Sequence, residues 1–153
     1  MRFLADAMLG TLAKWLRLLG YDTAYMNDSP DAALVARARS EDRVILTRDH
    51  GLARHRGVQT LLITEEELGA QLAQVLTAFH LSVAGMGSRC PVCNEPLRPL
   101  SLTEAAKRVP PYVVAHHTEF NECPVCGRVY WRGTHWEKMR ARLKEMGIEQ
   151  GGR

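Results

Sequence analysis

The chain has 153 residues, of which 46% are hydrophobic and 24% are charged, with a formal net charge of +3. This composition is typical of an ordinary soluble protein with one domain or two small ones, and no apolar run is long enough to span a bilayer. The N-terminal stretch lacks the pattern of a signal peptide, so we expect a cytoplasmic protein with no membrane partner.

Charge is unevenly distributed along the chain. Residues 1–88 contain 9 Lys and Arg against 10 Asp and Glu, a net charge of −1, whereas residues 89–153 contain 11 against 7, a net charge of +4. A mildly basic second half is compatible with a polyanionic partner. A mixed, solvated surface explains the same charge almost as well.

Four short apolar runs in the first half predict β-strands. Helical patterns separate these runs from one another. This alternation predicts an α/β fold, a parallel sheet with helices on both faces and right-handed crossovers. The four predicted strands are residues 2–5, 23–26, 44–47 and 59–63.

The segments between the strands carry signals for helix ends. The spacing of leucines over 9–19 predicts an amphipathic helix, and Gly20 suits the position after its C-terminus. The Ser-Pro-Asp segment 29–31 predicts a second helix, with the serine as cap and the proline at the first helical position. A short helix follows the third strand. Thr64 and Glu67 fit a capping box for a last helix.

The chain changes character after residues 82–88, a small-residue segment that we predict to be a linker. It would separate a domain over 1–81 from a second domain over 89–153 that contains all four cysteines. A charged helix is predicted over 135–146, and residues 150–153 are predicted to be a frayed tail.

Two identical CPVC segments predict a structural zinc site. Two residues between cysteines let both thiolates face one ion, and two such knuckles complete a tetrahedral shell. Gly127 follows the second knuckle, where a tight turn often requires a positive φ. A redox pair or buried thiols would be the alternatives, but two matched knuckles in a reducing compartment favour Zn²⁺. The predicted ligands are Cys90, Cys93, Cys123 and Cys126.

Four thiolates leave no coordination position for water, so this zinc is not expected to be catalytic. The histidines of the second half are therefore interpreted as surface or RNA-facing residues rather than ligands. They are His116, His117 and His135.

Acidic residues gather at the predicted carboxyl edge of the parallel sheet. Asp6 follows the first strand and Asp49 the third, while Asp31 begins the helix after the second and Glu65 follows the fourth. Ligands bind at this edge in open α/β sheets, and several carboxylates together are costly without a cation. Oxygen ligands suit Mg²⁺ or Mn²⁺, so the pattern predicts a metal-dependent site.

Each acid also has a simpler explanation. Asp31 could favour its helix dipole, and Glu65 could be an ordinary first-turn acid. Asp49 could begin a turn, and Asp28 could cap a helix. Asp6 is the hardest to explain in this way, because it follows a buried strand directly.

With these features the chain resembles the Mut-seven C-terminal RNase family, whose fold is a PIN-like nuclease domain followed by a zinc ribbon. The matching stretches are LADAMLGTLAKWLRLLGYDT (4–23), SPDAALVARARSEDRVILTRD (29–49), SRCPVCNEPL (88–97) and ECPVCGRVYWRGTHWEKM (122–139). The resemblance implies Asp6, Asp31 and Asp49 as the acidic metal-binding residues. Either Glu65 or Asp28 could be a fourth acid, or the site could have only three.

The first functional hypothesis is a metal-dependent ribonuclease, a hydrolase in which Mg²⁺ or Mn²⁺ activates water and neutralises the scissile phosphate. Basic residues would hold the RNA backbone, and aromatic residues of the ribbon would stack on bases. Packing inside the ribbon explains Tyr130 and Trp131 somewhat better. The predicted substrate-binding residues are Lys14, Arg17, Arg48 and Trp136.

Two other functions compete with this hypothesis. The chain could be a non-catalytic module that binds RNA or protein and retains a vestigial acidic site. A phosphoacceptor fold fits less well, because Asp6 follows the first strand and no suitably placed lysine is evident. The sequence contains neither a Walker loop nor a G-x-S-x-G segment, and it does not define the oligomeric state.

Overall fold

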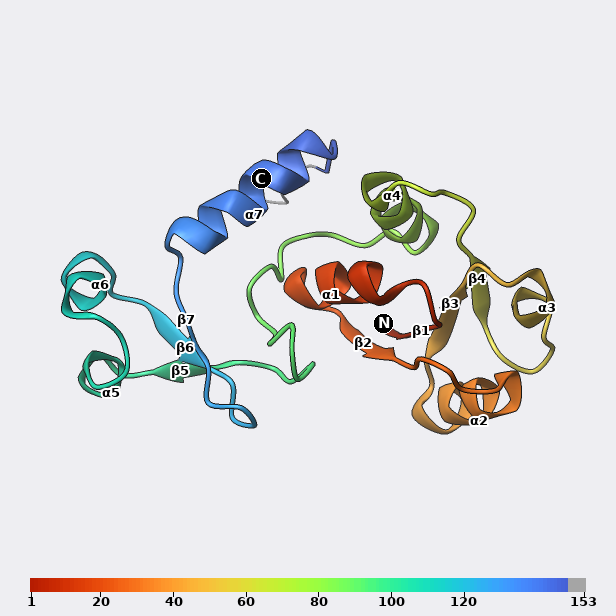
Figure 1. The fold of residues 1–153 in the computed structure, drawn as a ribbon, viewed down its shortest axis with the longest axis horizontal. Helices are drawn as coiled ribbons and strands as arrows, with labels where there is room; N and C mark the ends of the chain where they lie inside the picture. The colour runs from red at the N-terminus through yellow and green to blue at the C-terminus, as the bar shows by residue number, and fades with distance from the viewer. Residues whose placement is uncertain (149–153) are drawn as a thin grey trace.

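The computed structural model describes residues 1–148, which form a four-stranded parallel sheet and a three-stranded antiparallel sheet (Figure 1). No helix in this part of the chain is long and apolar enough to cross a membrane. The first sheet and its helices comprise β1 (Arg2–Ala5), α1 (Gly10–Leu18), β2 (Asp22–Tyr25), α2 (Asp31–Glu41), β3 (Val44–Thr47), α3 (His50–Ala53), β4 (Thr60–Leu62) and α4 (Leu68–Ala78).

The strand order of the first sheet is β2-β1-β3-β4, and all neighbouring strands are parallel. The predicted parallel sheet is therefore confirmed. Both faces are covered, which explains why β1 and β3 are almost continuously apolar. Phe3 and Leu46 belong to the hydrophobic cluster of α1 and α4, whereas Leu4 and Ile45 belong to the cluster of α2 and α3.

The end of α1 follows the sequence prediction. Gly20 has a φ of +99°. Its N–H donates to the carbonyl of Arg17 at 2.9 Å, and the N–H of Tyr21 donates to the carbonyl of Leu16 at 2.9 Å. These two bonds form a Schellman motif, which satisfies carbonyls that the helix leaves free.

Two predicted helix caps are wrong. α2 begins at Asp31, with Pro30 at the capping position and no side-chain cap, so Ser29 does not cap it. α4 begins at Leu68 rather than after Thr64. The N–H of Thr64 instead donates to Oε1 of Gln74 at 3.2 Å. Nε2 of the same side chain donates to the carbonyl of Leu62 at 2.8 Å, so α4 holds the preceding loop against the end of β4.

The second part of the chain forms a small antiparallel sheet in the order β5-β6-β7. A pair of short helices between β5 and β6 contributes to its separate hydrophobic cluster, together with Phe120 and Trp131. This arrangement agrees with the predicted fold class, a parallel sheet with flanking helices followed by a small four-cysteine ribbon. The elements are β5 (Arg98–Leu100), α5 (Leu102–Ala106), α6 (Pro111–His116), β6 (Phe120–Glu122), β7 (Val129–Tyr130) and α7 (Thr134–Glu145).

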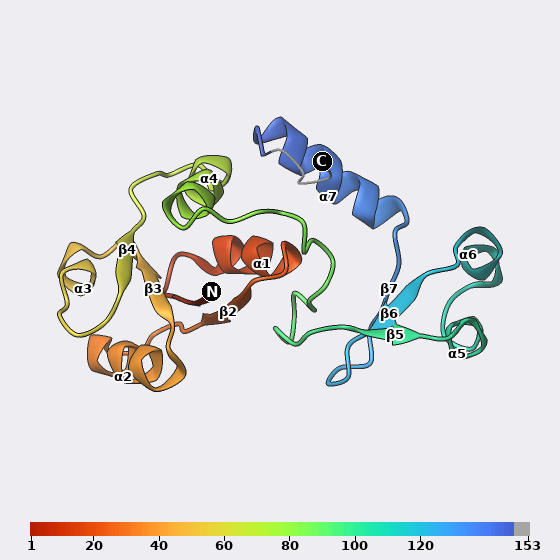
Figure 2. The ribbon, with the colours of Figure 1, turned by 180° about the vertical axis from the view of Figure 1, so that it is seen from behind.

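Helix α7 extends from the small sheet back toward α1 and α4 in both views (Figures 1 and 2). Leu143 and Ile148 are buried in the same cluster as Phe3. A Cβ on Gly69 of α4 would come within 2.9 Å of the Met146 side chain. The C-terminal helix therefore completes the core of the first sheet. The predicted domain division at 82–88 stays a prediction, and residues 150–153 lie outside the described residues.

Candidate functional site

The carboxyl edge of the first sheet contains a topological switch point. β1 and β3 are neighbours, but the chain leaves β1 toward β2 and leaves β3 toward β4, so a crevice is expected between their ends. Asp6 directly follows β1, and its N–H donates to the carbonyl of Leu46 at 3.0 Å. Asp49 lies two residues beyond β3. The prediction that both acids follow strands at the carboxyl edge agrees with this topology, which also makes the two strands central neighbours.

Thr47 links these two aspartates. Its hydroxyl donates to Oδ2 of Asp6 at 2.8 Å and accepts the N–H of Asp49 at 3.0 Å. The second oxygen of Asp6, Oδ1, accepts the N–H of Ala7 at 2.7 Å. Thr47 is fully buried and Asp6 is half-buried. The Asp6 carboxylate is thus held in one orientation. Sequence reasoning missed Thr47, although a hydroxyl that ends a buried strand beside two acids was a usable signal.

Asp49 has a local structural role as well. Its Oδ1 accepts the N–H groups of Gly51 at 2.7 Å and Leu52 at 3.3 Å, so the residue caps the short helix α3. The simpler explanation of Asp49 as a turn-forming residue is therefore partly correct. Its side chain is exposed at the sheet edge. Oδ1 accepts both capping bonds, so capping α3 does not use Oδ2 of Asp49.

In the described structure, Asp31 and Glu65 make no hydrogen bond to Asp6, Thr47 or Asp49. Asp31 is exposed in the first turn of α2. Glu65 is exposed, and its main-chain carbonyl accepts hydrogen bonds from Arg48 and from Gln71. Within residues 1–148, the four cysteines are the only group of His, Cys, Asp and Glu side chains close enough to share an ion. The described structure thus links Asp6 with Asp49 but does not gather all the predicted acids.

Two exposed side chains with apolar parts, Met8 and Tyr25, lie near Asp6 in the chain or in the sheet register. Met8 is 82% exposed and has a φ of +74°, a conformation that is strained for a side chain of this kind. Tyr25 at the end of β2 is also exposed. Its ring lies against Gly10, where a Cβ would approach within 3.2 Å. Strain and exposed apolar groups next to an acidic edge are features that binding sites often show.

The predicted substrate-binding residues lie in different environments. Lys14 is exposed on α1. Arg17 donates to the main-chain carbonyls of Thr23 and Pro91. Burial is the main reason that the pKa of Arg17 is lowered. Trp136 lies against Gly87, and the Arg132 guanidinium lies 4.8 Å from the centre of its ring.

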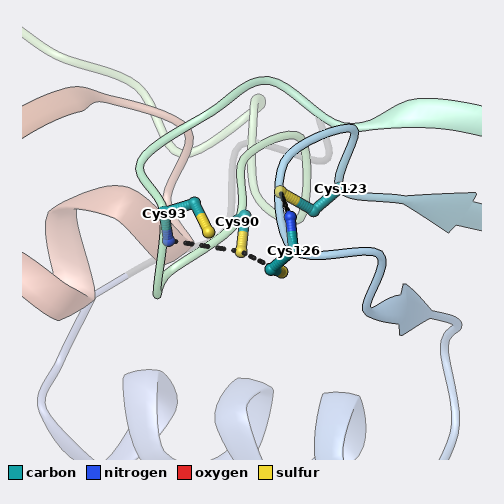
Figure 3. Close-up of side chains that lie close together, drawn as sticks. All are labelled: Cys90, Cys93, Cys123 and Cys126. Carbon is teal, nitrogen blue, oxygen red and sulfur yellow. Dashed lines mark hydrogen bonds between the residues drawn. The ribbon is translucent and has the colours of Figure 1, made fainter.

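The four cysteines converge as the sequence predicts (Figure 3). Their sulfurs all lie within 4.8 Å of one another, and Cys90 Sγ lies 3.9 Å from Cys126 Sγ. The N–H of Cys93 faces Cys90 Sγ at 3.4 Å, and the N–H of Cys126 faces Cys123 Sγ at 3.5 Å. Main-chain donors that face the sulfurs stabilise thiolates, so the donor set fits a structural Zn²⁺.

The surroundings of the cysteines affect their ionisation unequally. Hydrogen bonds from the backbone and side chain of Arg128 lower the pKa of Cys126 to about 6. Burial raises the pKa of Cys93 to about 12. The hydroxyl of Tyr130 lies 3.1 Å from Cys90 Sγ, and burial raises the pKa of that tyrosine. Tyr130 thus packs beside the cluster, and Trp131 packs against Phe120.

Comparison with known proteins gives a match to one protein family. We found no significant match among curated proteins or among solved structures. The model of one family, described as the Mut7-C RNAse domain, matches residues 1–143, which is nearly the whole chain. The resemblance inferred from the sequence is therefore confirmed, and the chain belongs to the Mut7-C RNase domain family.

Proposed function

We propose that this protein is a metal-dependent ribonuclease whose reaction centre lies at the carboxyl edge of the parallel sheet. The observation that carries the proposal is the link from Asp6 through the Thr47 hydroxyl to Asp49 at the switch point. Family membership supports an RNase activity. The metal dependence, the site residues and the roles given below are part of the proposal.

Asp6 and Asp49 would hold Mg²⁺ or Mn²⁺, with Asp31 as the third acid and Glu65 as a candidate for a fourth. A divalent cation of this kind supplies Lewis acidity, which activates water and neutralises charge on the scissile phosphate. The protein would contribute by holding the Asp6 carboxylate in place before the metal and RNA bind. Asp6 has one oxygen bound by Thr47 and the other by Ala7, which limits the motion of its side chain.

RNA would pass this edge and extend along α1 toward the amino end of the sheet, because Arg17 contacts Thr23 near the start of β2. Lys14 and Arg48 would contact phosphates, and Arg17 would have to use donors beyond those given to the carbonyls of Thr23 and Pro91. Trp136 offers an aromatic surface that is already covered on one side by Arg132. Stacking on a base would therefore compete with or extend a cation–π contact.

The four cysteines would hold one Zn²⁺ in a structural role, and the ribbon would aid RNA binding. Phosphate contacts release counterions, so RNA affinity should fall steeply as salt rises. A matched pair of variants tests the ribbon: Lys138→Gln removes an exposed charge from α7, and Glu137→Gln removes the opposite charge beside it. The first should weaken binding and reduce the salt dependence, and the second should not weaken binding.

Replacement of the central acids tests the catalytic proposal. Asp6→Asn and Asp49→Asn should abolish RNA cleavage that depends on Mg²⁺ or Mn²⁺, while the protein stays folded. Asp42→Asn is the matched control, because Asp42 is exposed at the C-terminus of α2 with a φ of +53° that asparagine tolerates. Cleavage that survives both test substitutions would contradict the proposal.

The alternative is a non-catalytic module that binds RNA or protein. It is favoured by the finding that, among the described residues, the aspartates do not form a group close enough to share an ion. In that case the protein would bind RNA without metal-dependent cleavage, and Asp6→Asn would leave RNA affinity unchanged. Titration of Mn²⁺ in the presence of RNA separates the two functions.

A further inference from the structure

The two cysteine knuckles have the same conformation. In the first, the N–H of Asn94 donates to the carbonyl of Cys90 at 2.9 Å, and in the second, the N–H of Gly127 donates to the carbonyl of Cys123 at 2.9 Å. Asn94 has a φ of +61° and Gly127 a φ of +75°. The residue after each CPVC segment is therefore left-handed, which Gly adopts freely and Asn adopts at small cost.

The knuckles differ in what this residue faces. A Cβ on Gly127 would meet nothing within 4 Å. The Asn94 side chain instead contacts the first sheet: its Oδ1 accepts the N–H of Thr23 at 3.0 Å, and its Nδ2 donates to Oδ1 of Asp22 at 2.7 Å. The left-handed turn does not require the Asn94 amide, because Gly127 forms the same turn without a side chain. The contacts of the Asn94 side chain therefore point to a second role for this residue.

This second role of Asn94 concerns β2, at the edge of the four-stranded sheet. β2 is an edge strand, and an edge strand has main-chain groups that no neighbouring strand can bind. The N–H of Thr23 is bound by Asn94, and the carbonyl of Thr23 accepts Nε of Arg17 at 2.7 Å. Both outward main-chain groups of this fully buried residue are thus satisfied by side chains rather than by a strand.

Arg17 connects the same strand to the same knuckle. Its Nη1 donates to the carbonyl of Pro91 at 3.0 Å and to that of Val92 at 3.4 Å. These carbonyls belong to the two residues between Cys90 and Cys93. Their orientation therefore depends on the shape of the knuckle, which a metal ion would fix.

The contact continues into the sheet through Asp22. The carboxylate that binds Asn94 also accepts Nη1 of the buried Arg43 at 2.7 Å. Arg43 in turn donates to the carbonyl of Phe3 in β1 at 3.0 Å. At the other end of β2, the N–H of Met26 donates to the carbonyl of Ala5, the residue before Asp6. The knuckle is thus linked to the strand that flanks the acidic edge.

We propose that the first cysteine knuckle is a metal-dependent clamp on edge strand β2, with Asn94 and Arg17 as its positioning residues. When Zn²⁺ holds Cys90 and Cys93 to the other two cysteines, the clamp is closed and β2 is fixed against β1. When the metal is removed, the knuckle loses its shape, both bonds to Thr23 weaken and β2 opens more often. The clamp stands independently of the proposed ribonuclease activity.

Two reciprocal substitutions in the full-length, zinc-loaded protein test the clamp. Asn94→Gly keeps the left-handed turn but removes the amide, and Gly127→Asn places an amide at the equivalent position of the second knuckle, where it meets nothing. Both variants should retain about one zinc per chain. Hydrogen exchange at the Thr23 amide should accelerate on the order of tenfold in Asn94→Gly, as expected for the loss of one hydrogen bond. It should be unchanged in Gly127→Asn.

Chelation of zinc from the wild-type protein should accelerate exchange at Thr23 as well, and it should have a smaller further effect in Asn94→Gly because the clamp is already open. Asn94→Asp gives a second variant, since it keeps an acceptor for Thr23 but repels Asp22. It should fall between wild type and Asn94→Gly. Unchanged protection of Thr23 in Asn94→Gly, or after chelation, would overturn the proposal. Because no readout uses RNA, an inactive protein could still confirm the clamp.

Discussion

The hydroxyl of Thr47 lies 2.8 Å from Oδ2 of Asp6 and holds that carboxylate against the end of β3. The same oxygen accepts the N–H of Asp49 at 3.0 Å. One buried hydroxyl therefore orients the carboxylate of Asp6 and binds the main chain of Asp49, the residues that follow two neighbouring parallel strands. The acidic edge is organised by a residue that carries no charge.

Replacement of this hydroxyl should affect stability and metal affinity together. Thr47→Val keeps the shape and leaves the N–H of Asp49 without its acceptor, so we expect a loss of about 1–2 kcal/mol in the free energy of unfolding. The Asp6 carboxylate keeps only its bond from the N–H of Ala7 and becomes more mobile, so Mn²⁺ affinity should fall. Urea denaturation and Mn²⁺ titration measure the two effects.

Thr23→Val is the matched control for this substitution. Thr23 is also fully buried in a strand, but its hydroxyl donates to the carbonyl of Tyr21 at 3.0 Å and makes no hydrogen bond to an acid. The Thr23→Val variant should lose about as much free energy of unfolding as Thr47→Val, but it should keep the Mn²⁺ affinity of the wild type. Equal Mn²⁺ affinity in Thr47→Val and wild type would show that Thr47 does not organise the site.

The elements that could be predicted from sequence are those with strong local patterns. Continuous apolar runs located β1 and β3, because both faces of a central parallel strand are buried. Gly20 located the end of α1, because a left-handed residue is needed there. The two CPVC segments located the cysteine cluster, because their spacing already contains the geometry of the site.

The features that could not be predicted depend on contacts between distant segments. Asn94 fits a tight turn equally well with or without a partner, so nothing in the sequence indicates its bonds to Thr23 and Asp22. The charged pattern of α7 gives little sign that Leu143 completes the core of the first sheet. The capping signal at Thr64 gives no sign that the N–H of this residue is bound by Gln74, a side chain ten residues away.

Metal analysis should find about one zinc per chain in protein purified without chelator, because four thiolates complete a tetrahedral shell. Cys93→Ser should lose the metal and lower the melting temperature of the whole chain, since the first knuckle is bonded to β2. Val92→Ser changes an exposed residue of the same knuckle that is not a ligand. It should retain the zinc. Protein that contains no zinc would contradict the metal assignment.

Truncation of Leu143 tests the role of α7 in the first sheet. Leu143 is fully buried among residues of α1, α4 and β1. Leu143→Ala should therefore lower the free energy of unfolding by about 2–5 kcal/mol, as expected for a core leucine. Leu102→Ala is the control, because Leu102 is 46% exposed, and it should change stability by less than about 0.5 kcal/mol. Equal effects would show that α7 does not contribute to the core.

Asp22 should make the stability of the protein depend on pH in the acid range. Burial opposes ionisation of its carboxyl group, but hydrogen bonds from Arg43 and Asn94 outweigh burial and hold the pKa below its usual value of 3.8. Because the pKa is lower in the folded state than in the unfolded state, the ionised group stabilises the fold above about pH 4. That contribution is lost as pH falls further, through the folded-state pKa.

Asp22→Asn removes this contribution at every pH. The variant should be less stable than wild type on the order of 1 kcal/mol at pH 6, a value reduced by solvent screening because the carboxylate is 23% exposed. The difference should shrink below pH 4, where the wild-type carboxyl group becomes protonated. Asp42→Asn removes the same charge from an exposed site and should show no such convergence. Denaturation curves between pH 2.5 and pH 6 measure the trend, and a difference that stays constant over this range would show that the charge of Asp22 does not stabilise the fold.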